Sequence, residues 1–140
     1  MDAKTFYIAG PMRGKKLYNF PTFFEAAIVL RSQGHTVFNP AERDMAVGFN
    51  PAETMESQGF NLSEAFTWDF ESIQKSQAIV LLPGWEKSSG VAAELAVAWY
   101  CGKKEHYEYD PVTRRLLQPG LSFLQPVVAH DFARLKPARS

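Results

Sequence analysis

The N-terminal part of the chain combines short apolar segments with one helical stripe. Residues Thr5–Ala9 are mostly β-branched or aromatic and end at a Gly-Pro pair, which is typical of a buried strand. Apolar residues then recur at helical spacing between Pro21, which suits the first turn of a helix, and Gly34, which suits its end. His35–Asn39 is a second short strand candidate. This strand–helix–strand order predicts a right-handed crossover and therefore a parallel sheet.

The next segment, residues 41–62, has no regular hydrophobic period. Glycine, proline and methionine are scattered there among polar residues, and a structureless segment of this length in a small domain is usually functional. We therefore expect a lid or insertion at residues 41–62. Ser63 is the expected N-cap of the following helix, in which apolar residues recur at helical spacing from Ala65 to Ile73.

A third strand is expected at Ala78–Leu82. This segment is apolar without alternation, the pattern of a central parallel strand that is buried on both faces. Ser88 or Ser89 can cap the helix that follows, Gly90–Cys101.

The C-terminal part of the chain is less regular. Alternating polar and aromatic residues before the turn at Asp110-Pro111 predict a variable hairpin at residues 104–119. Pro126–His130 is a further strand candidate, and Asp131–Lys136 is a candidate for a last helical turn. We expect a single domain over residues 1–140.

Composition and charge narrow the class of protein. The 140 residues carry 15 Lys and Arg against 15 Asp and Glu, and this zero net charge argues against binding of nucleic acid polymers. The single cysteine, Cys101, excludes an intramolecular disulfide and a multi-cysteine metal site, and its place at the end of an apolar helix predicts a buried position. No apolar run approaches the roughly 18 residues of a membrane span, and the N-terminus lacks the pattern of a secretory signal. We therefore expect a soluble, cytoplasmic protein without membrane contact.

Glu94 is the only charged residue of the Gly90–Cys101 helix. A helix that is apolar on every side is usually buried on most sides, and a lone buried carboxylate needs a partner or a wet cavity. The glycine and alanines around it leave room for a ligand near the backbone. Glu94 is therefore the first candidate for catalysis. The alternative is a glutamate on a narrow exposed edge of the helix.

Further candidates are expected at one rim of the sheet. Ligands of open parallel sheets bind beyond the carboxyl ends of the strands, where the loops after the first and third strands would meet. A helix N-terminus with free N–H groups binds phosphate, and an arginine can add a bidentate contact. The residues concerned are Gly10, Pro11 and Arg13 in the first loop, and Ser88, Ser89 and Gly90 in the other. A plain turn and a solvent-exposed arginine are the alternatives.

Asp69 is a second candidate acid. It lies between Trp68 and Phe70 on the helix before the third strand, and the sequence allows it to face the same rim. Two carboxylates in one pocket push their pKa values apart, so that one can be a nucleophile while the other carries a proton. The alternative is a solvent-facing aspartate. No spacing of histidine or cysteine indicates a metal site.

Three segments, in this order, resemble the nucleoside 2-deoxyribosyltransferase superfamily, especially its small phage and bacterial members. They are Tyr7–Gly14, Asp69–Val80 and Ser88–Ala98, and the last is the most specific. The resemblance covers roughly residues 5–103. It implies a three-layer α/β/α sandwich around a Rossmann- or flavodoxin-like parallel sheet of about five strands.

The resemblance also implies cleavage of the N-glycosidic bond of a nucleoside or nucleotide. By that match Glu94 is the nucleophile that attacks the anomeric carbon, and Asp69 handles the proton at the leaving base. Tyr7 matches a tyrosine that lies near the nucleophile. The family uses no metal and no organic cofactor. Its sites are often completed by a neighbouring subunit, which implies a homo-oligomer, a dimer or larger.

Two activities occur in this superfamily. Transferases pass the deoxyribosyl group to another base, whereas N-hydrolases release base and sugar phosphate from nucleoside 5′-monophosphates. The Gly10–Gly14 loop and the Ser88–Gly90 turn resemble the phosphate-contacting segments of the hydrolases. We therefore expect a nucleotide N-glycosidase that acts through a covalent glycosyl-glutamate intermediate; the alternatives are base exchange and nucleotide binding without cleavage. Aromatic residues that could stack on the base are Phe20, Trp68 and Trp85.

Overall fold

The computed structural model describes residues 1–102 and 105–118. The strands are β1 (Thr5–Ala9), β2 (Thr36–Phe38), β3 (Ala78–Leu81), β4 (His106–Asp110) and β5 (Arg115–Leu117). The α-helices are α1 (Phe20–Ser32), α2 (Pro40–Ala46), α3 (Leu62–Lys75) and α4 (Ser89–Tyr100). Short 3-10 helices are η1 (Lys16–Asn19), η2 (Glu56–Gln58) and η3 (Trp85–Lys87). The strand expected at Pro126–His130 and the helical turn at Asp131–Lys136 lie outside the described residues.

The five strands form one sheet in the order β2-β1-β3-β4-β5. β1 pairs in parallel with β2 and β3, and β3 pairs in parallel with β4. The hairpin expected at residues 104–119 is present as β4 and β5, which pair antiparallel, and its first arm extends the parallel sheet. The order 2-1-3-4-5 is that of flavodoxin-like doubly wound folds, in which the winding direction reverses between β1 and β3.

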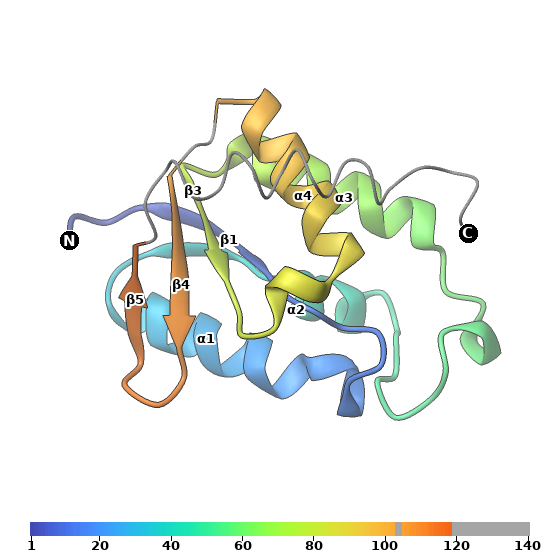
Figure 1. The fold of residues 1–140 in the computed structure, drawn as a ribbon. Helices are drawn as coiled ribbons and strands as arrows, with labels where there is room; N and C mark the ends of the chain where they lie inside the picture. The colour runs from blue at the N-terminus through green and yellow to red at the C-terminus, as the bar shows by residue number, and fades with distance from the viewer. Residues whose placement is uncertain (103–104, 119–140) are drawn as a thin grey trace.

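Side chains of the sheet alternate between two cores. Phe6 and Ile8 point to the face that is covered by α1. Tyr7 and Ala9 point to the opposite face, where they pack with α3 and α4. Figure 1 shows α1 on one side of the sheet and α3 and α4 on the other. All four residues of β3 are buried, so the expected three-layer fold and its buried central strand are confirmed.

The segment expected as a lid, residues 41–62, is not structureless throughout. Its first part belongs to α2, because the Asn39 side chain accepts a hydrogen bond from the Ala41 amide at 3.0 Å and Pro40 fits the first turn. This helix buries Asp44 and exposes Met45, so it shows no apolar stripe in the sequence. The rest of the segment runs as loops and η2 to the start of α3.

The structure corrects the expected N-cap of α3 and the expected burial of Cys101, and it decides which serine caps α4. Asn61 rather than Ser63 caps α3 through its side-chain oxygen. Ser88 caps α4 in the same way. Cys101 is exposed, not buried, because the chain turns outward at the end of α4, where Tyr100 is 79% exposed. Over the described ranges, no helix is long and apolar enough to cross a membrane.

Candidate active site

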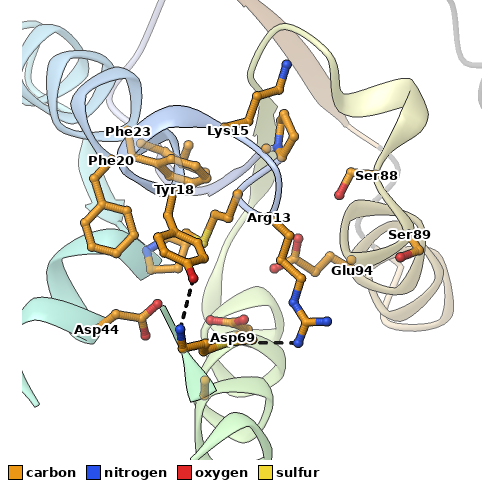
Figure 2. A pocket seen from close by; sticks show the side chains of 18 of the residues that line it. Arg13, Lys15, Tyr18, Phe20, Phe23, Asp44, Asp69, Ser88, Ser89 and Glu94 are labelled. Atoms are coloured by element: carbon orange, nitrogen blue, oxygen red, sulfur yellow. Dashed lines mark hydrogen bonds between the residues drawn. The ribbon is translucent and has the colours of Figure 1, made fainter. Parts of the chain in front are cut away.

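A cavity of about 920 Å³ lies at the carboxyl ends of β1 and β3. Its lining residues come from the loops after these two strands, from α2 and the segment that follows it, and from α3 and α4. In a doubly wound sheet, this is the crevice where ligands bind, because the connections of two adjacent strands leave in opposite directions there. Figure 2 shows the side chains that line it. The cavity is thus at the rim that the sequence predicts.

Glu94 reaches this cavity from the second turn of α4. It does not lie on an exposed edge of the helix, because the hydroxyl of Tyr7 donates a hydrogen bond to its Oε2 atom. Tyr7 is fully buried within β1, so the central sheet determines where this hydroxyl lies. The fold therefore joins a strand residue and a helix residue that are 87 positions apart.

Asp69 reaches the same cavity from α3 and is only 9% exposed. It does not face solvent. The Tyr7 hydroxyl also interacts with this carboxyl, while it donates its one proton to Glu94. Figure 2 shows the Asp69 and Glu94 side chains in one cavity, approaching from two helices.

Burial makes both acids hold their protons more strongly than usual. It raises the pKa of Asp69 to about 7, and the negative charge of Asp44 acts in the same direction. The interaction with the Tyr7 hydroxyl and the charge of Arg43 oppose this rise. Burial also raises the pKa of Glu94 well above its usual range, with further contributions from the charges of Asp69 and Asp44.

Tyr7 stays protonated between these acids. Burial raises the pKa of its phenol, and the charges of Glu94 and Asp69 raise it further. It therefore acts as a hydrogen-bond donor, and its bond to Glu94 stabilises the ionised form of that carboxyl. Together, the three side chains can hold a proton near neutral pH and stabilise one ionised carboxylate. An acid catalyst beside a nucleophile needs these two properties.

Asp44 is a third acid of the cavity that sequence reasoning missed. It is 7% exposed on α2, and Arg43 lies 3.2 Å from its Oδ1 atom. Burial raises the pKa of Asp44 to about 6, while the hydrogen bond and the charge of Arg43 act against the rise. The Asn39-Pro40 pair at the end of β2 was the available signal, because it starts a helix at the same rim of the sheet.

The mouth of the cavity is polar and basic. Its residues are the three cations Arg13, Lys15 and Lys87, one acid, Glu86, and the polar turn Ser88, Ser89 and Gly90. Arg13 is exposed; its Nη2 atom lies 3.9 Å from Met55 Sδ, and it forms no salt bridge in the part of the chain that the structure describes. The Ser88 hydroxyl accepts the Val91 amide hydrogen at 3.2 Å, so it serves as a helix cap. These positions fit the expected phosphate end.

Gly10 and Pro11 line the cavity, and packing accounts for the glycine. A Cβ atom on Gly10 would lie 2.8 Å from Leu82 Cβ, which is too close. The two loops therefore meet only because the first one begins with glycine. The Pro11 carbonyl accepts a hydrogen bond from the Asn19 side chain at 2.9 Å, which holds the loop after β1 in place.

Of the three aromatic residues expected to stack on the base, one, Phe20, lines the cavity. Trp68 does not, because it packs against Phe38 at a ring distance of 6.2 Å. Trp85 does not line the cavity either. It is buried in the core that contains Tyr7, and its indole donates to Glu108 Oε1 at 3.0 Å. The aromatic lining comes instead from a group that we call the aromatic wall: Tyr18, Phe20, Phe49 and Phe60.

Comparison with known proteins places this site within a family. The profile of a family described as a domain of unknown function (DUF4406) matches residues 4–107. The chain belongs to this DUF4406 family. The matched range includes every cavity residue named above, from Gly10 to Glu94, and also Tyr7, so the site lies within the DUF4406 domain itself. A comparison with functionally curated proteins finds no match. Within residues 1–102 and 105–118, no group of three His, Cys, Asp or Glu residues is arranged to hold a metal ion.

Proposed function

We propose that this protein hydrolyses the N-glycosidic bond of a (deoxy)nucleoside 5′-monophosphate, releasing the free base and (deoxy)ribose 5-phosphate. One observation carries the proposal: two buried carboxyls, Asp69 and Glu94, share a cavity and a phenol, Tyr7, that donates to Glu94. Cleavage of a glycosidic bond requires a carboxylate beside the anomeric carbon and an acid beside the leaving group. The three segments that resemble the nucleoside 2-deoxyribosyltransferase superfamily support the same chemistry.

The first step uses the pair with one proton between them. Ionised Glu94 attacks the anomeric carbon, the bond from that carbon to the base nitrogen breaks, and neutral Asp69 gives its proton to the departing base. In the second step, Asp69 takes a proton from water while the water oxygen displaces Glu94 from the anomeric carbon. Glu94 is ionised again and Asp69 is neutral again, so the cycle closes.

The raised pKa of Asp69 suits its role as proton donor and acceptor. The pKa of Asp69, about 7, lies where a group can both give and take a proton near neutral pH. When Asp69 holds the shared proton, the Tyr7 hydroxyl bonds the ionised Glu94. Burial of the site increases the strength of every electrostatic contact to the reacting sugar.

The basic mouth would hold the 5′-phosphate. Arg13 can bind two phosphate oxygens, and the first amides of α4 point to the same place from Ser89 and Gly90. This contact lies away from the reacting bond, so its binding energy positions the anomeric carbon.

Base release measured by chromatography tests the proposal. The full chain is incubated with ribo- and deoxyribonucleoside 5′-monophosphates and with the matching nucleosides, with and without a second free base. We expect base to be released from monophosphates without an acceptor, and we expect Glu94→Gln to abolish release while keeping the fold. Glu71→Gln, an exposed acid on α3, is the matched control and should retain activity. Near-normal release by Glu94→Gln would refute the proposal.

Two other functions are outcomes of the same assay. Base exchange that requires an acceptor would indicate a transferase. Nucleotide binding without any release is favoured by one observation, the strongly raised pKa of Glu94, because a protonated carboxyl cannot attack. The superfamily resemblance further implies a homo-oligomer, which sedimentation of the purified chain tests.

A further inference from the structure

The cavity has two chemically different ends. Its mouth is basic, whereas its opposite end is formed by the aromatic wall and Asp44. Figure 2 shows Asp44 beside Tyr18 and Phe20, on the side of the cavity away from Ser88 and Ser89. Glu94 and Asp69 lie between the two ends. A nucleotide placed with its sugar at Glu94 and its phosphate at the mouth therefore directs its base towards Asp44.

The aromatic wall is centred on Phe49. The rings of Tyr18, Phe20 and Phe60 lie 5.1, 5.7 and 4.9 Å from the ring of Phe49. The Phe49 amide donates to the main-chain carbonyl of Asp44 at 2.9 Å, which ties this wall to the acid. A flat ring and a carboxylate are thus presented together. Aromatic side chains of this kind stack on nucleobases.

The Asp44 carboxyl has capacity for a ligand. Arg43 contacts its Oδ1 atom, and across the described ranges the structure shows no other hydrogen-bond donor to this carboxyl. An ionised carboxylate accepts about four hydrogen bonds and donates none. Only 7% of the Asp44 surface is exposed, so a hydrogen bond from a ligand to this carboxyl would be largely shielded from water.

The edges of the common bases differ in how well they fit such an acceptor. Guanine presents two adjacent donors, the ring N1–H and the 2-amino group, which match the two oxygens of a carboxylate. Hypoxanthine keeps the ring N–H but lacks the amino group. Adenine and cytosine present an amino donor next to a ring acceptor, and uracil and thymine present one donor between two carbonyls.

We propose that Asp44 is a specificity residue that reads two adjacent N–H donors on the base, so that guanine nucleotides are the preferred ligands of this cavity. This inference rests on the proposed function, because it takes the nucleotide orientation from the roles of Glu94 and Arg13. Arg43 is then a positioning residue, since its contact with Oδ1 orients the carboxylate.

The test measures binding separately from cleavage. Affinities for guanosine, inosine and adenosine 5′-monophosphate, in ribo and deoxy forms, are measured by calorimetry at pH 7.5 with the Glu94→Gln protein. We expect the guanine nucleotide to bind at least about tenfold more tightly than the hypoxanthine nucleotide, since the two differ by one hydrogen bond to a charged group. Asp44→Asn in the same background should reduce this ratio to about threefold or less, because an amide offers only one acceptor oxygen. Glu42→Gln, a change on the same helix outside the cavity, should leave the ratio unchanged.

The outcomes separate this inference from the proposed function. Equal affinities for guanine and hypoxanthine nucleotides would overturn the role of Asp44, even if Asp44→Asn failed to fold, and so would a ratio that Asp44→Asn leaves intact. A reduction of all affinities by the same factor would make Asp44 a structural residue only, which also overturns the inference. A guanine preference in a wild-type protein that releases no base would refute the proposed function and support the inference. Binding of no monophosphate at all would refute both.

Discussion

Replacing Asp69 by asparagine should stabilise the fold while it removes the proposed acid. The carboxyl is 9% exposed, and its pKa is raised from 3.8 to about 7, chiefly by burial. Between about pH 4 and pH 7 the folded protein therefore binds a proton on Asp69 that the unfolded chain does not bind. Stability is lost as the pH rises through this window, because ionisation of Asp69 then favours the unfolded chain, in which the charge is hydrated, over the folded state, in which the carboxyl stays neutral until about pH 7.

The magnitude follows from the two pKa values. Each tenfold change in an acid dissociation constant is about 1.4 kcal/mol, so the charge on Asp69 destabilises the fold by about 4 kcal/mol above pH 7. Asparagine carries no charge and has nearly the same shape. Asp69→Asn should thus be more stable than the wild-type chain by about 3–4 kcal/mol at pH 8. At pH 5 the difference should fall to about 2 kcal/mol, because the wild-type carboxyl is then protonated in the folded state.

Urea unfolding at pH 5 and pH 8, followed by circular dichroism, measures these free energies. Glu71→Gln on the same helix is the control, and because Glu71 is exposed we expect its effect to stay within about 0.5 kcal/mol. The reasoning fails if Asp69→Asn is no more stable than the wild type at pH 8. It also fails if the difference between the two proteins is the same at both pH values.

Three further changes test other parts of the site. Tyr7→Phe removes the hydrogen-bond donor to Glu94, so the pKa of Glu94 should rise further. The acid side of the kcat/KM profile should then move to higher pH, and kcat should fall roughly tenfold or more. An unchanged pH–rate profile would contradict the role of the phenol. Arg13→Ala should raise KM for monophosphates roughly tenfold or more and leave KM for nucleosides nearly unchanged. Steady-state kinetics with both substrate classes measure this. An equal rise in KM for both classes would mean that Arg13 does not bind the phosphate. Gly10→Ala places a Cβ atom 2.8 Å from Leu82 Cβ, so thermal unfolding should show a loss of about 1–3 kcal/mol, whereas an unchanged Tm would mean that the two loops separate freely.

Local patterns in the sequence were sufficient for the framework of this fold. β1 and β3 are apolar on both faces, and α1 has a helical stripe, so strand, helix and parallel pairing follow from neighbouring residues. The rim that carries the cavity follows as well, because the carboxyl ends of parallel strands meet at one edge. Glu94 was identifiable for a related reason: one charge in an apolar helix needs an explanation that the helix itself does not supply.

Only the tertiary structure determined which residues complete the cavity. Asp44 and Phe49 come from a segment without a period, and their burial depends on the contacts of α2 with α1 and α3 rather than on their own neighbours. Trp68 and Trp85 are aromatic and could stack on a base, but both pack into the core between the sheet and helices α3 and α4. A side chain's direction at a helix or loop position depends on how the whole element packs.

The protonation of the site likewise depends on the assembled structure. The sequence alone predicts that two acids at one rim would have separated pKa values, but both are raised because both are desolvated and each adds to the charge near the other. Tyr7 is an ordinary strand residue in the sequence, and it becomes a hydrogen-bond donor to Glu94 only because β1 lies under α4. Residue type and order thus determine which groups are present, whereas desolvation and proximity between distant segments determine which of them hold a proton.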